Sequence, residues 1–257
     1  MTNIKSSALK VCLFFLLACS IWSCTKEPIE PITEEPIIEE PVVEPSDTMV
    51  TDTTMVDTTV AVSYTYLALG DSYTIGQSVP EEMRWPNQLR DTLLTNDINI
   101  SEVKFIAQTG WTTTSLLNAI DSQSPVKHDV VSLLIGVNNQ FQGGSFELFK
   151  TEFDDLLNIA IDLCVAGDKV FVVSIPDYGV TPFGSSDSEQ IAEELDMYNA
   201  YMEGKSAALN IPFINITEIS RTLGSGDNAL APDNLHPSGF QYTKWVEEIY
   251  PIVVDLF

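Results

Sequence analysis

From residue 65 onward, short apolar runs alternate with longer stretches in which apolar side chains recur at helical spacing. The apolar runs cover residues 66–69, 103–107, 130–135, 170–174 and 213–216. The stretches with helical spacing cover residues 85–94, 113–121, 146–166, 188–209 and 240–254. Continuous apolar strands separated by amphipathic helices are typical of a parallel sheet that helices cover on both faces. This alternation predicts an α/β fold.

Polar or glycine-containing segments follow the first three apolar runs, where a parallel sheet forms its sites. Residues 70–76 read Gly-Asp-Ser-Tyr-Thr-Ile-Gly and place Ser72 on a turn from strand to helix, where backbone N–H groups face a ligand. In the second segment Gly110 has no side chain that would block its N–H, although this segment by itself indicates only a turn and a helix cap. In the third, the Asn138 side chain can donate an N–H to an oxyanion, although an asparagine that caps its own loop is commoner.

A fourth segment, residues 231–239, precedes the last helical stretch and reads Ala-Pro-Asp-Asn-Leu-His-Pro-Ser-Gly. The three-residue spacing allows the Asp233 carboxylate to accept the Nδ1–H of His236, which leaves Nε2 free to face a serine. The chain has only one other histidine, His128, which we expect at the opposite end of the sheet as an ordinary surface residue. His236 is therefore the candidate general base.

Together the four segments resemble the sequence blocks of the SGNH branch of the GDSL hydrolases, over essentially all of residues 64–257. The resemblance implies a three-layer α/β/α sandwich with a five-stranded parallel sheet like that of flavodoxins. It implies that Ser72 is the nucleophile, that His236 accepts its proton and that Asp233 orients His236. It also implies an oxyanion hole made of the backbone N–H groups of Ser72 and Gly110 and the side chain of Asn138.

The third block departs from the pattern of that family. It commonly reads Gly-x-Asn-Asp, whereas here Asn139 takes the place of the acid. The oxyanion donor Asn138 is retained, so we expect activity, but the groups that support Asn138 must differ. The Gly-x-Ser-x-Gly pentapeptide of the α/β-hydrolases does not occur in the sequence.

The N-terminal 24 residues are typical of an export signal. Lys5 and Lys10 lead into an apolar stretch that is short for a transmembrane span. Its cysteines resemble those of a bacterial lipoprotein signal, in which a cysteine after a small residue becomes the lipidated mature N-terminus. Cys19 follows the better lipobox spelling, but Cys24 leads directly into the polar sequence, so we favour Cys24 with Cys19 as the alternative. We expect a protein exported and lipid-anchored to the cell envelope, at the outer membrane or cell surface.

Residues 25–61 form a predicted acidic, Pro- and Thr-rich disordered tether, which leaves residues 62–257 as a single hydrolase domain. Residues 25–60 contain ten acidic residues and a single basic residue, Lys26. The Pro-Glu repeat in this segment has neither helical nor strand periodicity. Asp47, Asp52 and Asp57 each precede a threonine and resemble the O-glycosylation sites of Bacteroidetes. A glycosylated tether and an unmodified linker both remain hypotheses.

The charge and the cysteines exclude several classes of function. A formal net charge of −25 repels nucleic acid and anionic headgroups, so we expect no nucleic-acid partner and no membrane contact except through the lipid anchor. The predicted domain holds one cysteine, Cys164, which rules out an internal disulfide and a cysteine zinc site. Cys164 lies in an apolar helical pattern and is expected as a core thiol. No metal and no cofactor are expected.

The sequence therefore predicts a serine ester hydrolase for small acyl or acetyl esters, with a small molecule or a glycan as the ester substrate. A lysophospholipase or thioesterase is the alternative within the same chemistry. A non-catalytic carbohydrate-binding protein on the same fold is an alternative of another class. Such a protein is expected to have lost the serine, the histidine or the oxyanion groups, and all of them are present here.

Overall fold

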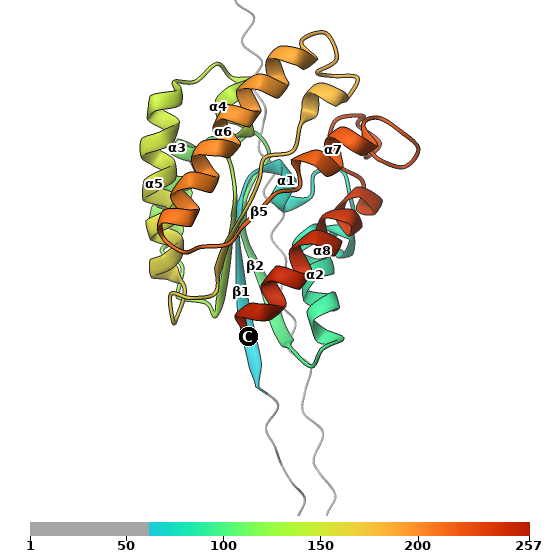
Figure 1. The fold of residues 1–257 in the computed structure, drawn as a ribbon. Helices are drawn as coiled ribbons and strands as arrows, with labels where there is room; N and C mark the ends of the chain where they lie inside the picture. The colour runs from blue at the N-terminus through green and yellow to red at the C-terminus, as the bar shows by residue number, and fades with distance from the viewer. Residues whose placement is uncertain (1–61) are drawn as a thin grey trace, which may run out of the picture. The chain divides into compact units, whose positions relative to one another are not determined.

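The computed structural model describes residues 62–257 (Figure 1). The predicted signal peptide, the tether, and the lipidation candidates Cys19 and Cys24 lie outside the described residues. None of the helices between residues 62 and 257 is long and apolar enough to span a membrane.

Five parallel strands form one sheet in the order β2-β1-β3-β4-β5. The strands are β1 (Ser63–Gly70), β2 (Asn99–Ala107), β3 (Val130–Leu134), β4 (Val170–Val173) and β5 (Phe213–Ile214). All five residues of β3 are buried, as are all four of β4, because helices cover both faces of the sheet. The predicted five-stranded parallel sheet is confirmed.

Helices cover both faces of the sheet, as Figure 1 shows. Helices α2 (Trp85–Leu94) and α8 (Gly239–Val253) lie on one face, and α3 (Thr113–Gln123), α5 (Phe146–Leu163) and α6 (Ser188–Ala208) lie on the other. The shorter helices are α1 (Ser72–Ile75), α4 (Val137–Phe141), α7 (Thr217–Leu223), and the 3₁₀ turns η1 (Glu81–Met83), η2 (Tyr178–Val180) and η3 (Val254–Leu256). The α/β/α layering predicted from the sequence is therefore confirmed.

Helix α5 shows why the periodicity of the sequence was informative. Ser145 caps its N-terminus by accepting the N–H of Leu148, and Phe149, Phe153 and Leu156 then bury one face of the helix. The helix ends at Leu163, three residues before the predicted end. Cys164 leaves the helix because it forms a parallel bridge with His128.

His128 is not the surface residue that the sequence suggested. It does lie at the amino end of β3, but only 5% of it is exposed. Its backbone N–H donates to Leu163 O, its carbonyl accepts the N–H of Val165, and its Nδ1 pairs with Val126 O. This bridge draws His128 and Cys164 into the interior together, and Cys164 is a buried core thiol as predicted.

The strand order reverses direction between β1 and β3, because β1 has β2 on one side and β3 on the other. Loops that leave the carboxyl ends of such a pair diverge to opposite faces and open a crevice between them. Ser72 begins the helix just after β1 and Asn138 lies in the helix just after β3, so both predicted site residues lie at this crevice.

Candidate active site

Ser72 is the first residue of α1, directly above the end of β1. Asp71 caps this short helix, with its Oδ1 accepting the N–H of Tyr73 at 3.0 Å. The chain turns so tightly here that a Cβ on Gly70 would lie 2.1 Å from Thr74 Oγ1 and 2.4 Å from the carbonyl oxygen of Leu134. Only glycine therefore fits before Asp71, and this close approach sets Ser72 at the carboxyl edge of the sheet.

The Asp71 carboxyl group is wholly buried behind Ser72, which sequence reasoning missed. Burial raises the pKa of Asp71 to about 7, although the hydrogen bond from the Tyr73 N–H acts in the opposite direction. An aspartate before a serine gives no signal of such burial, because the same pair is common as an exposed helix cap.

Asp233 and His236 form the carboxylate–imidazole pair that their spacing predicted. Nδ1 of His236 lies 2.8 Å from Asp233 Oδ2, while Asp233 Oδ1 accepts the backbone N–H groups of Leu235 and His236. Partial burial tends to raise the pKa of Asp233, but hydrogen bonds from Ser78, the two backbone groups and the imidazole outweigh it and lower this pKa to about 2. Asp233 is therefore ionised at neutral pH, which favours the tautomer of His236 with its proton on Nδ1 and leaves Nε2 to accept one.

Ser78 is a further member of this unit that the sequence did not reveal. Its hydroxyl donates to Asp233 Oδ2 at 2.7 Å across 155 residues of chain. Ser78 has a φ of 67°, in the left-handed region that a serine seldom adopts. The local sequence pattern does not indicate this role for Ser78, because only the tertiary fold brings the loop after α1 beside the loop that carries Asp233 and His236.

The three predicted oxyanion donors lie around one space. Gly110 has a φ of +84°, which a residue with a side chain rarely adopts, and neither its N–H nor that of Ser72 has an acceptor among residues 62–257. The side-chain amide of Asn138 donates one hydrogen to Trp111 O at 2.9 Å. An amide nitrogen carries two hydrogens, so this bond orients Asn138 and leaves the second hydrogen for a ligand.

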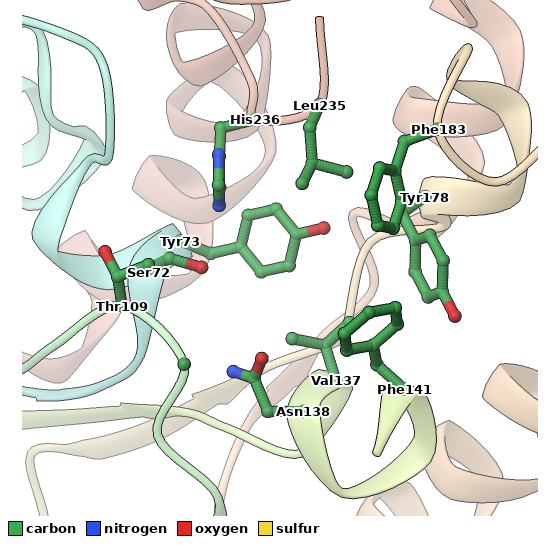
Figure 2. A pocket seen from close by; sticks show the side chains of 11 residues that line it. Ser72, Tyr73, Thr109, Val137, Asn138, Phe141, Tyr178, Phe183, Leu235 and His236 are labelled. Carbon is green, nitrogen blue, oxygen red and sulfur yellow. The ribbon is translucent and has the colours of Figure 1, made fainter. Parts of the chain in front are cut away.

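Ser72, Gly110, Asn138 and His236 line a single pocket of about 220 Å³. Figure 2 shows the imidazole of His236 pointing toward Ser72, with the amide of Asn138 across from it. The pocket is otherwise lined, mostly by apolar groups, by Tyr73, Thr109, Val137, Phe141, Tyr178, Phe183 and Leu235. The structure thus brings together residues from all four sequence segments.

An aromatic wall, made of Phe141, Tyr178 and Phe183, closes the far side of the pocket from Ser72 (Figure 2). The ring centroids of Phe141 and Phe183 are 5.6 Å apart, and each lies just over 6 Å from Tyr178. About half of Phe141 and of Phe183 remains exposed to solvent. Phe146, the first residue of α5, does not line the pocket and packs against Tyr198 in the core.

Buried polar contacts hold the η2 turn, which carries Tyr178. The Asp177 side chain is only 2% exposed, and its Oδ2 pairs with Nε of Arg221 at 2.9 Å. Its Oδ1 accepts the N–H of Gly179, while the Tyr178 hydroxyl donates to Gln140 Oε1 at 2.8 Å. These contacts tie the η2 turn, and with it Tyr178 of the aromatic wall, to both α4 and α7.

Within residues 62–257, no three His, Cys, Asp or Glu side chains gather in a way that would hold a metal ion. The groups that face the pocket are a hydroxyl, an imidazole, an amide and two backbone N–H groups, which suit acyl transfer through an oxyanion.

Comparison with known proteins gives one family. Residues 68–243 match the model of the GDSL-like Lipase/Acylhydrolase family. No curated protein is similar enough in sequence to count as a match.

Several solved structures share the fold. A family 3 carbohydrate esterase of Clostridium thermocellum has a TM-score of 0.56 at 20% identity, over 76% of this chain and 97% of its own. A variant of an acetyl xylan esterase from Geobacillus stearothermophilus has a TM-score of 0.59 at 16% identity, over 74% of this chain and 94% of its own. The psychrotrophic esterase EstA of Pseudoalteromonas sp. has a TM-score of 0.52 at 18% identity, over 73% of this chain and 94% of its own. At these identities the likeness shows the fold alone.

Proposed function

The chain belongs to the GDSL-like lipase/acylhydrolase family, and from this premise we propose that it hydrolyses short acyl esters, including acetyl esters of glycans, with Ser72 as nucleophile. The observation that carries the proposal is the convergence of Ser72, His236, Gly110 and Asn138 on one pocket. A non-catalytic binding protein has no use for this particular set of groups.

In the mechanism that we propose, each group at the pocket has one role. Ser72 Oγ bonds to the acyl carbon while its proton passes to Nε2 of His236, and the Asp233 carboxylate stabilises the resulting imidazolium. The carbonyl oxygen takes the negative charge and accepts hydrogen bonds from the three oxyanion donors. Collapse of this intermediate expels the alcohol, which takes the proton from Nε2. Water then attacks the acyl carbon of the acyl-enzyme while one of its protons passes to Nε2. Collapse of this second intermediate releases the acid, and the proton returns from Nε2 to Ser72 Oγ.

The size and lining of the pocket support short acyl groups. A volume of about 220 Å³ is below the range of ~300–1,000 Å³ common for drug-sized ligands. The aromatic wall faces Ser72 across this space, so we place the acyl group against it and the alcohol part toward solvent. The carbohydrate esterase and the acetyl xylan esterase among the structural neighbours support a glycan as the alcohol part. The acidic surface opposes a phospholipid headgroup with exposed phosphate.

The acyl preference of the purified protein is the first prediction. Among p-nitrophenyl acetate, butyrate and octanoate, we expect kcat/KM to be lowest for octanoate, because the aromatic wall leaves no room for a long chain. Replacing Phe183 by alanine removes part of this wall and should raise kcat/KM for octanoate relative to acetate by about 10-fold, a common value of a hydrophobic pocket contact. Phe240→Ala is the matched control, since Phe240 is similarly exposed but lies outside the pocket. A wild-type protein that prefers octanoate would favour the lysophospholipase or thioesterase alternative.

Export and lipid anchoring are proposed from the N-terminal sequence alone. In cells fed a clickable fatty acid, we expect label on the wild-type protein and on Cys19→Ser, but none on Cys24→Ser. Label on Cys24→Ser but none on Cys19→Ser would instead identify Cys19 as the lipidated residue. A wild-type protein without any label would end the lipoprotein proposal.

A further inference from the structure

Three buried polar side chains from three helices are joined by hydrogen bonds behind the oxyanion hole. Asn139 of α4 pairs with Thr113 of α3 through two bonds: the Thr113 N–H donates to Oδ1 at 3.0 Å, and Nδ2 donates to Thr113 Oγ1 at 2.7 Å. The Thr113 hydroxyl then donates to Oε2 of Glu152 on α5 at 2.5 Å. Asn139 is 5% exposed, Thr113 is fully buried and Glu152 is 9% exposed.

These contacts tie together the two segments that supply the oxyanion donors. Asn139 is the neighbour of Asn138, while Thr113 begins the helix that follows Gly110 and Trp111. The Asn138 amide itself donates to Trp111 O, which belongs to the same loop as Gly110. A shift of α4 against the start of α3 would therefore move Asn138 and Gly110 apart, and a displacement of even about 1 Å is costly for a catalytic geometry.

The direction of each hydrogen bond in this network is determined by its neighbours. The Thr113 backbone N–H can only donate, so the oxygen of Asn139 must face it and the amide nitrogen must face the Thr113 hydroxyl. That hydroxyl has one hydrogen, which it donates in its hydrogen bond to Glu152. The hydroxyl oxygen is then left as an acceptor, which is satisfied by an amide at position 139 but not by a carboxylate.

We infer that Glu152 is a positioning residue for the oxyanion hole, and that it makes asparagine, rather than the acid common in the family, the residue required at position 139. With Glu152 present, a carboxylate at position 139 would face a hydroxyl oxygen that has no hydrogen left to give. Glu152 also accepts the Thr114 hydroxyl at 2.6 Å, so both of its oxygens are held from the start of α3. The inference rests on the proposed function, because its effect is read in ester hydrolysis.

A double-mutant cycle on the full-length protein tests this coupling. Asn139→Asp should lower kcat by about 10-fold with KM changed less than about 2-fold, because the two acceptors repel and α4 moves against α3. Adding Glu152→Gln should return kcat to within about 3-fold of wild type, since the glutamine amide donates to the Thr113 hydroxyl, which then turns its hydrogen to the new carboxylate. Glu152→Gln alone should have a small effect, because its oxygen still accepts the Thr113 hydroxyl.

Glu147→Gln is the matched control, because Glu147 is an exposed acid of the same helix and should not rescue Asn139→Asp. Equal losses of kcat from Asn139→Asp with and without Glu152→Gln, or no loss at all, would overturn the inference. If Asn139→Asp proves too unstable to assay, recovery of a folded protein in the double variant supports the coupling, and its failure to fold counts against it. A wild-type protein that hydrolyses no ester would overturn the proposed function instead, and that outcome is seen before any variant is made.

Discussion

Replacing Ser72 or His236 by alanine should lower kcat for ester hydrolysis by at least about 10⁴-fold, the scale seen when a nucleophile or its base is removed. Without the hydroxyl there is no acyl-enzyme, and without the imidazole the hydroxyl keeps its proton. The two groups act as one unit, so the double variant should be no worse than either single variant. Steady-state kinetics on p-nitrophenyl acetate measures all three losses.

Both variants should remain folded, so the loss can be assigned to chemistry. The Ser72 side chain lines the pocket, and its loss leaves the Asp71 cap of α1 in place. In His236→Ala, Asp233 keeps the Ser78 hydroxyl and two backbone N–H groups, which hold the loop. Ser122→Ala, a change of an exposed serine on α3, is the control and should match wild type. A fluorophosphonate should add its mass to the wild-type protein but not to Ser72→Ala; full turnover by Ser72→Ala would rule out the serine mechanism.

Replacing Asn138 by alanine should lower kcat by about 10²–10³-fold, the usual effect of losing one oxyanion donor. The amide hydrogen that faces the pocket is worth most when the carbonyl oxygen carries a full charge, which is in the transition state and not in the bound ester. KM should therefore change much less than kcat. Measuring the two parameters separately on the preferred short ester tests this role.

The structure also supplies a control for Asn138. Asn158 lies exposed on α5, and among residues 62–257 its side chain hydrogen-bonds only within its own helix, to Asp154 O, so Asn158→Ala should leave kcat unchanged. If Asn138→Ala raised KM while kcat stayed the same, Asn138 would be a binding residue for the ground state. The backbone donors of Ser72 and Gly110 would then have to supply the oxyanion hole alone.

The order of strands and helices and the position of the four site segments could be predicted from the sequence. Each of these depends on a local pattern: continuous apolar residues in a strand that is buried on both faces, or apolar residues at helical spacing. Once the sheet is parallel, segments that follow its strands must lie at one edge, and so Ser72, Gly110 and Asn138 meet. The Asp233–His236 pair was also predictable, because it spans only three residues.

Only the tertiary structure decided which side chains support these groups. Ser78 reaches Asp233 from a loop 155 residues away, Glu152 reaches Thr113 from another helix, and His128 is drawn inward by its bridge to Cys164. The aromatic wall is of the same kind, because Phe141, Tyr178 and Phe183 come together from different parts of the chain. The physical reason is that a hydrogen bond or a ring contact has a range of a few ångströms. Residues far apart in the chain come within that range only through the packing of whole helices and loops, which no local period encodes.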